Sequence, residues 1–139
     1  MNYKMINIRT VMNQGNNKSG LSFVENEHDI PFKIKRMYFI YKEEEELQKG
    51  FYLHEKSCHL FFCPNGKINI NIDKGDVNTV VSLDDPSKGL LIQSDLWREI
   101  EWKTDGSVLC IATAEHYQPH RYKRDYIEYL KYLESKDVE

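Results

Sequence analysis

The residues best suited to chemistry lie in the segment Gly-Phe-Tyr-Leu-His-Glu-Lys, at positions 50–56. If this segment is a β-strand, Tyr52 and His54 project from the same face, because side chains alternate with period two. An imidazole can accept and donate protons near neutral pH, and a phenol can donate or relay one. The pair could therefore be an acid/base pair, two metal ligands, or packing with an incidental imidazole.

The spacing around this pair resembles the first motif of metal-binding cupins, which are small β-barrels with the pattern Gly, His-x-His, Glu, Gly. Tyr52 and His54 take the His-x-His positions, His59 follows where the Glu would lie, and Gly66 closes the turn. A second cupin motif ends in a third His, and Arg98 fills that position here. A guanidinium stays protonated and offers no lone pair to a metal, so we expect no catalytic metal.

Arg98 indicates an anionic ligand instead, because a planar guanidinium donates two hydrogen bonds to phosphate in a fixed fork. Lys18, Arg36 and Lys49 would line the same barrel mouth in a cupin, although they could also be ordinary surface charges. Several cations, aromatic side chains and a His would suit a sugar nucleotide. The aromatic candidates for contact with its base or sugar are Tyr38, Trp97 and Phe51.

The elements that must position these residues have the pattern of β-strands. Apolar and polar residues alternate most clearly at 67–73, where three isoleucines face one way. Turn residues separate this run from similar runs at 5–8, 21–25, 34–41, 49–54, 58–63, 77–83, 88–92, 96–102 and 107–114. Strands at this spacing, with no helices between them, predict an all-β sandwich or barrel.

Two segments depart from the strand pattern. The four carboxylates of residues 43–46 would repel one another in a packed strand, so we expect a solvated loop there. From Tyr122 onward, aromatic and aliphatic residues recur with helical spacing. This stripe predicts one amphipathic C-terminal helix over residues 122–135.

The bulk composition limits the remaining possibilities. A chain of 139 residues with no linker is expected to form a single domain over residues 1–139. Its net charge of −3 contains no large single-sign block, so neither nucleic acid nor a membrane is expected as a partner. The chain lacks an apolar run of roughly 20 residues, and its three cysteines show no CxxC spacing. We expect a soluble, cytoplasmic protein with ordinary core cysteines.

Five ordered blocks resemble the TDP-4-oxo-6-deoxy-glucose 3,4-ketoisomerases, which are WxcM-like or FdtA-like cupins. The resemblance extends from about Ile6 to Leu130. The blocks are residues 30–41, Gly50-Phe51-x-x-His54-x-Lys56, Asp84-x-Pro86-x-x-Gly89-Leu90, Trp97-Arg98-Glu99 and Tyr122-x-Arg124-Asp125-Tyr126. The resemblance implies a cupin-type jelly-roll barrel with a short C-terminal helix, assembled as a homodimer that uses neither metal nor organic cofactor.

Members of this family move a ketone from C4 to C3 of a TDP-linked 6-deoxyhexose through an enediol, which leads to 3-amino-3,6-dideoxy sugars of surface glycans. The family motif Gly-Phe-His-x-His supplies two histidines, of which the second matches His54 and the first is Tyr52 here. The resemblance implies His54 as the base and Tyr52 as an auxiliary acid or relay. The implied substrate-binding residues are Lys18, Arg36, Tyr38, Lys49, His59, Trp97 and Arg98.

The Tyr52 position leaves other functions open. A non-catalytic sugar-nucleotide-binding cupin with a degenerate acid/base pair is the main alternative. A metal-free sugar epimerase on the same barrel and a structural β-domain without a ligand are further alternatives. His59 could likewise be a hydrogen-bond partner in the cavity or a second acid/base group that replaces the missing His.

Overall fold

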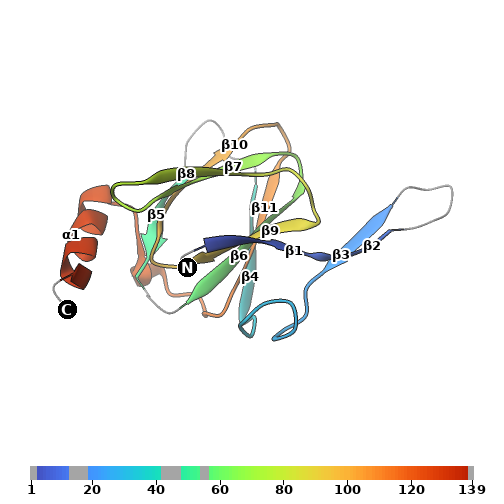
Figure 1. Cartoon of the computed structure of the whole chain (residues 1–139), viewed down its shortest axis with the longest axis horizontal. Coiled ribbons are helices and arrows are strands. Elements are labelled where there is room, and N and C mark those ends of the chain that lie inside the picture. The colour runs from blue at the N-terminus through green and yellow to red at the C-terminus, as the bar shows by residue number, and fades with distance from the viewer. Residues whose placement is uncertain (1–2, 13–18, 42–47, 54–56, 138–139) are drawn as a thin grey trace.

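Antiparallel strands make up most of the computed structural model, which describes residues 3–12, 19–41, 48–53 and 57–137. One five-stranded sheet has the order β1-β9-β6-β11-β4, with bounds Tyr3–Asn7, Lys88–Gln93, Cys58–Asn65, Val108–Thr113 and Arg36–Tyr41. A second has the order β12-β5-β10-β7-β8, with bounds Tyr122–Lys123, Gln48–Tyr52, Trp97–Trp102, Ile68–Asp73 and Asn78–Leu83. The two sheets enclose the core (Figure 1) and confirm the predicted all-β, cupin-type jelly roll.

The core lies between the inner faces of the two sheets. Ile68, Ile70 and Ile72 of β7 are almost fully buried, while the residues between them are half-buried. This alternation is the one that the sequence predicts for residues 67–73. Burying each such side chain contributes about 1.5–3 kcal/mol to the free energy of unfolding, and the facing strands β6, β9 and β11 supply the partners.

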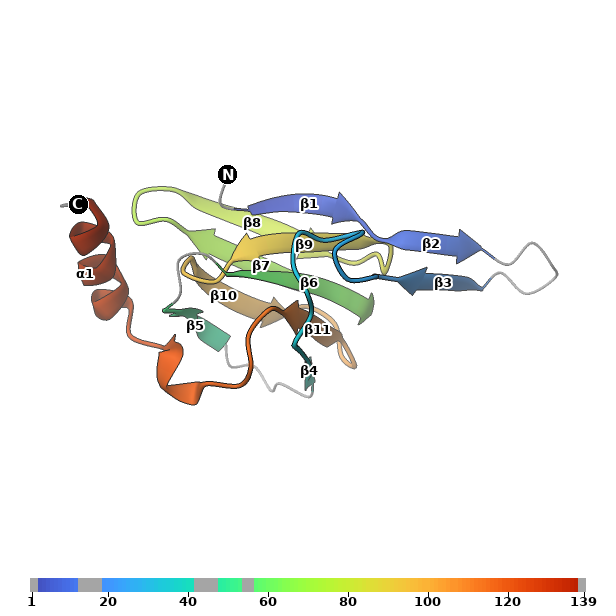
Figure 2. The same ribbon diagram turned by 90° about the horizontal axis from the view of Figure 1, so that it is seen from below.

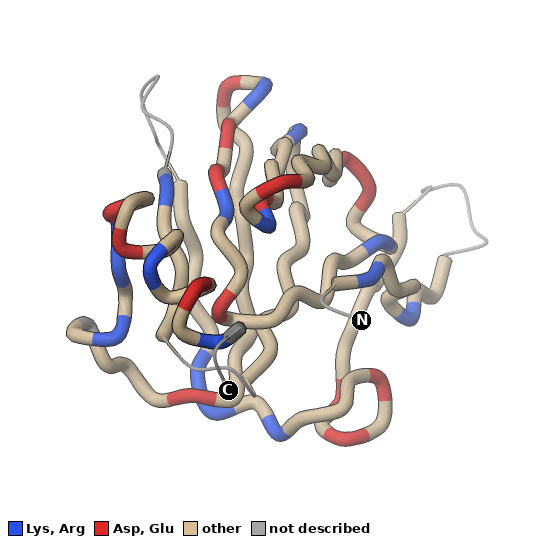
Figure 3. The backbone as a smooth tube through the Cα atoms, turned by 60° about the vertical axis from the view of Figure 1, so that its left-hand side comes forward, with Lys and Arg blue, Asp and Glu red and all other residues tan. Residues whose placement is uncertain are grey.

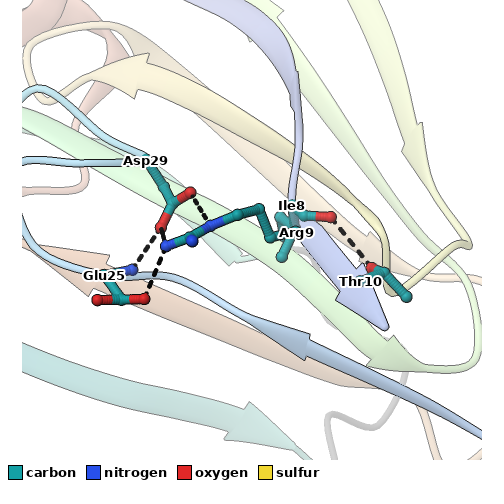
Figure 4. A network of polar contacts seen from close by, with 5 residues as sticks. All are labelled: Ile8, Arg9, Thr10, Glu25 and Asp29. Carbon is teal, nitrogen blue, oxygen red and sulfur yellow. Dashed lines mark hydrogen bonds and ion pairs between the residues drawn. The ribbon is translucent and has the colours of Figure 1, made fainter. Parts of the chain in front are cut away.

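A two-stranded hairpin, β2 (Arg9–Met12) and β3 (Gly20–Phe23), projects from the body of the molecule (Figure 2). Its base is fixed by Arg9, which donates two hydrogen bonds to Asp29, of 2.6 and 2.7 Å, and one of 2.9 Å to Glu25 (Figure 4). The fork geometry of the guanidinium favours such a paired contact. The sequence pattern does not predict β2, because most of this strand faces solvent.

The C-terminal helix α1 covers Tyr126–Asp137 and packs at the end of the molecule opposite the hairpin (Figure 2). It begins four residues later than the sequence stripe indicates, because Asp125 accepts hydrogen bonds from the amides of Ile127 and Glu128 and so caps it. Tyr122 is not helical but belongs to β12, which pairs with β5.

The surface carries interspersed charges, with basic and acidic residues alternating along the backbone (Figure 3). The three cysteines are free, and two of them, Cys63 and Cys110, are buried in the core. In the part of the chain that the structure describes, no helix has both the length and the apolar character to cross a bilayer. The loop expected at residues 43–46 lies outside the described residues.

Candidate active site

Three polar side chains form one row across the inner face of the first sheet. Thr113 of β11 pairs with Arg36 of β4 on one side and with His59 of β6 on the other. Paired strands lie about 4.8 Å apart, so Arg36 and His59 are separated by roughly 10 Å along the sheet. The strand pairing therefore places a cation and an imidazole on the same level of the barrel interior.

Arg98 of β10 reaches this row from the opposite sheet. Its side chain is buried, and Nη1 lies 3.1 Å from Nδ1 of His59. The guanidinium also donates to the backbone carbonyls of Ser94 and Leu96. None of its hydrogen-bond partners among the described residues is a carboxylate, and the negative charge that acts on it comes from nearby Asp95 without a direct hydrogen bond.

The contact with Arg98 determines the tautomer of His59, and burial together with nearby cations keeps the ring neutral. A guanidinium only donates hydrogen bonds, so Nδ1 must be the acceptor and the ring proton resides on Nε2. Burial, followed by the positive charges of Arg98 and Arg36, holds the pKa of His59 well below its usual 6.5. Nε2 is buried and has no hydrogen-bond partner among the described residues. His59 is thus a neutral imidazole with an unpaired N–H donor.

Tyr52 lies beside this imidazole at the end of β5. Its ring meets the His59 ring edge-on, with 5.5 Å between the two centroids. The hydroxyl donates to the backbone carbonyl of Gln118 at 3.3 Å, and Nη2 of Arg36 approaches its oxygen at 3.5 Å. The phenol is therefore placed between a cation and a carbonyl, where its proton can be exchanged with a neighbouring oxygen.

Aromatic rings surround the Arg36 guanidinium. It lies 4.8 Å from the ring centroid of Tyr38 and 5.5 Å from that of Tyr117, both cation–π contacts. Burial raises the pKa of Tyr38 to about 12, so this phenol stays protonated. Nε of Arg36 is a second buried donor without a hydrogen-bond partner in the described ranges.

The structure adds Tyr117, Gln118 and Tyr122 to the site. Tyr117 and Gln118 belong to the segment between β11 and β12, where the sequence shows no regular pattern, and Tyr122 begins β12. Tyr122 pairs with Tyr52, and its hydroxyl donates to the carbonyl of Lys49 at 2.9 Å. The Tyr-x-Arg-Asp-Tyr block and the aromatic spacing from Tyr122 onward are sequence signals at the end of this region.

A glycine allows this segment to close over β5. Gly50 has φ +153°, and a Cβ there would lie 2.5 Å from the carbonyl oxygen of Lys123 and 2.7 Å from the ring of Tyr122. Contacts this short do not occur with real side chains, so β12 could not pair with β5 if position 50 carried one. Gly50 is also the cross-strand neighbour of Arg98, which places the glycine directly beside the buried cation.

The structure separates three predicted site residues, Trp97, Phe51 and Lys49, from the barrel interior. Trp97 is adjacent to Arg98, so it faces the other side of β10, where it packs with Phe51 and Tyr129 beneath α1. Lys49 is exposed and pairs across strands with Glu99. Glu99 is two positions after Trp97 in β10, so the side chains of all three residues lie on the same face of the sheet. Their positions therefore do not match the expected contacts with a ligand inside the barrel.

Two other predicted site residues, His54 and Lys18, lie outside the described residues. The remaining predicted residues, Arg36, Tyr38, Tyr52, His59 and Arg98, meet in the barrel interior as described above. Among described residues, no group of three His, Cys, Asp or Glu side chains is placed to hold a metal ion.

Comparisons with known proteins agree with this fold. The model of the FdtA family, described as WxcM-like, C-terminal, matches residues 1–134. The chain is 28% identical over 139 residues to the TDP-4-oxo-6-deoxy-alpha-D-glucose-3,4-oxoisomerase of Aneurinibacillus thermoaerophilus, covering 100% of this chain and 98% of that protein.

Solved structures give the same relationship. The crystal structure of QdtA, a sugar 3,4-ketoisomerase from Thermoanaerobacterium thermosaccharolyticum in complex with TDP, matches with a TM-score of 0.86 and 31% identity, over 97% of this chain and 96% of that chain. A mutant of QdtA in complex with TDP-4-keto-6-deoxyglucose matches with a TM-score of 0.87 and 31% identity, over 99% and 98% of the two chains.

Proposed function

The chain belongs to the FdtA family of WxcM-like, C-terminal domains, and on this premise we propose that it is a TDP-sugar 3,4-ketoisomerase. Its substrate is a TDP-4-oxo-6-deoxyhexose, and the reaction moves the ketone from C4 to C3 through an enediol. The ketoisomerase relatives at 28–31% identity over nearly the whole chain support this activity. The observation that carries it is the buried group of Arg98, His59, Tyr52 and Arg36 inside the barrel.

The reaction needs one proton removed from C3 and one delivered to C4. We assign the base to His54, whose imidazole can titrate near neutral pH. Tyr52 is the auxiliary acid or relay, which its contacts with Arg36 and the Gln118 carbonyl support. A tyrosine in this role keeps the reaction possible while making proton transfer slower than a second histidine would.

The nucleotide sugar is held by cations and aromatic rings. Arg36 supplies a half-buried guanidinium beside Tyr38, and its Nε has no hydrogen-bond partner among the described residues, which suits a diphosphate or sugar hydroxyl next to an aromatic face. Lys18 is assigned to the same role from the sequence. Arg98 and His59 lie deeper in the barrel and are assigned to the sugar.

We also propose that the enzyme is a cytoplasmic homodimer that supplies precursors of 3-amino-3,6-dideoxy sugars. The support for dimerisation is the outer face of β4, where Met37, Phe39 and Tyr41 expose 50–66% of their surface. A contiguous apolar strand face of this kind is unusual on a monomer and suits a second copy of the chain. Sedimentation at micromolar concentration tests it, and a monomer under those conditions would contradict it.

The test of the activity is proton NMR of TDP-4-oxo-6-deoxyglucose incubated with the protein in D2O. We expect a 3-oxo sugar with deuterium at the new C4 centre. The same sugar without protein is the control, because a proton beside a ketone exchanges slowly by itself. If the protein binds TDP but neither exchanges the proton at C3 for deuterium nor moves the ketone, the proposal is contradicted.

A further inference from the structure

We propose that His59 is a catalytic residue that donates its Nε2–H to the sugar oxygen on which negative charge develops during enolisation. The inference rests on the proposed ketoisomerase function and adds a residue to its chemistry. It assigns His59 a hydrogen-bonding role, distinct from the proton transfers assigned to His54 and Tyr52.

The first support is the state of the imidazole. Arg98 donates to Nδ1, which leaves the proton on Nε2, at the side of the ring away from the guanidinium. That N–H is buried, with no acceptor among the residues the structure describes. A buried donor without an acceptor destabilises the free protein, and a ligand oxygen can recover that loss by accepting from it. The site is therefore built to receive an acceptor at Nε2.

The second support is what the reaction requires. When the base takes the C3 proton, the C3–H electron pair becomes the C3–C4 double bond and the carbonyl pair moves onto O4. O4 then takes a proton to give the enediol. Finally O3 loses its proton as the C3 carbonyl forms, and C4 takes a proton. Negative charge thus develops on O4 in the first half of the reaction and on O3 in the second, and a fixed hydrogen-bond donor stabilises it.

The third support is the low basicity of His59. Because burial and two cations hold its pKa well below 6.5, the ring is neutral throughout the physiological range. A neutral imidazole can polarise a carbonyl without giving up its proton irreversibly, which suits an enediolate. Arg98 acts as a positioning residue, because its hydrogen bond to Nδ1 fixes the tautomer and its charge strengthens the Nε2–H donor.

The location of His59 agrees with this role. Its ring contacts Tyr52, so the donor lies next to the group assigned to move protons. Thr113 separates it from Arg36 on the same row, and Nε of Arg36 is another buried donor without a hydrogen-bond partner among the described residues. The sugar ring would thus lie between two donors on one sheet and Tyr52 on the other.

Two variants separate the donor from the contact with Arg98. His59→Gln can still accept from Arg98 and still donate through its amide. His59→Glu can accept from Arg98 but offers no donor. We expect H59Q to keep kcat within about tenfold of the parent and H59E to lose about 10²–10³ in kcat, both with unchanged affinity for TDP. Equal kcat in the two variants would overturn the proposal.

Nitrogen-15 NMR of the unmodified protein tests the same contact without relying on turnover or on the folding of a variant. The His59 signal should show a proton on Nε2 only, and it should shift with TDP-4-oxo-6-deoxyglucose and not with TDP. A proton on Nδ1, or a signal that the sugar leaves unchanged, would overturn the assignment. Sugar binding without isomerisation would refute the ketoisomerase function, and the NMR shift would still decide whether His59 contacts the sugar.

Discussion

Arg98 and His59 come from opposite sheets and meet at 3.1 Å, and this single contact sets the proton position of the imidazole. Arg98 is in turn held by the carbonyls of Ser94 and Leu96, in the turn before its own strand. The two sheets are thus linked inside the barrel by a polar pair, at the level where Tyr52 also points inward.

Removing this cation should raise the pKa of His59. Burial is the largest cause of the lowered pKa, Arg98 the second and Arg36 the third. We therefore expect Arg98→Met to raise the pKa without restoring 6.5, and Arg36→Met to raise it less. An NMR titration of the His59 ring measures both. A larger rise in the Arg36 variant would contradict the assigned order of the two charges.

The lowered pKa of His59 should make the protein less stable in acid. The unfolded chain binds a proton at this residue below about pH 6.5 and the folded chain does not, so its contribution is complete above that pH and is lost as the pH falls. Between pH 7.5 and 5.5 the parent should lose more free energy of unfolding than H59Q, by on the order of 1 kcal/mol. Urea unfolding at both pH values checks this, and parallel losses would argue for a charged His59.

Replacing Gly50 by Ala should prevent β12 from pairing with β5. The added Cβ would lie within 2.7 Å of both Lys123 and Tyr122, so strand and ring must move. We expect a loss of roughly 3 kcal/mol in free energy of unfolding and a fall in turnover. Gly106→Ala is the matched control, because its φ of +77° is also unfavourable but nothing lies within 4 Å, and it should cost only about 1–2 kcal/mol. Equal effects would show that backbone strain alone matters.

Trp97→Phe should affect stability and not substrate affinity. Trp97 packs beneath α1 with Phe51 and Tyr129, on the face of β10 away from Arg98. We expect about 1–3 kcal/mol lower free energy of unfolding with KM for the TDP-sugar within twofold. Tyr38→Ala is the comparison, and should raise KM because Tyr38 lies beside Arg36 in the interior. A large rise in KM for the Trp97 variant would indicate that Trp97 contacts the substrate.

Much of the fold follows from period-two alternation, which is strongest where one side of a strand meets the core. The isoleucines of 68–72 show it because β7 is buried on one face and open on the other. The pattern fails at Arg9–Met12, since β2 pairs only with β3 and has no core to face. The aromatic spacing places the start of the C-terminal helix too early, because Tyr122 continues the spacing although it belongs to β12. Asp125, which caps the helix, is the sequence signal for the correct start.

The sequence predicts which residues belong to the site but not how their side chains are arranged in space. His59 is a polar residue in an apolar run, which marks it as unusual, whereas Arg98 lies in a strand that also holds Glu99 and Glu101. The two are 39 positions apart, and their contact depends on which strands face each other. Trp97 could have been separated from Arg98, since adjacent residues of a strand point to opposite faces. Gln118 could not have been found, because its backbone carbonyl, not its side chain, binds Tyr52.

The row formed by Arg36, Thr113 and His59 has a consequence for how this site can evolve. Backbone pairing between three adjacent strands sets the spacing of these positions, and the side chains contribute little to it. A mutation at one position therefore changes the chemistry presented to the ligand while the other two stay in place. The chemistry of this row can therefore change one side chain at a time while the backbone pairing keeps the spacing of the three positions.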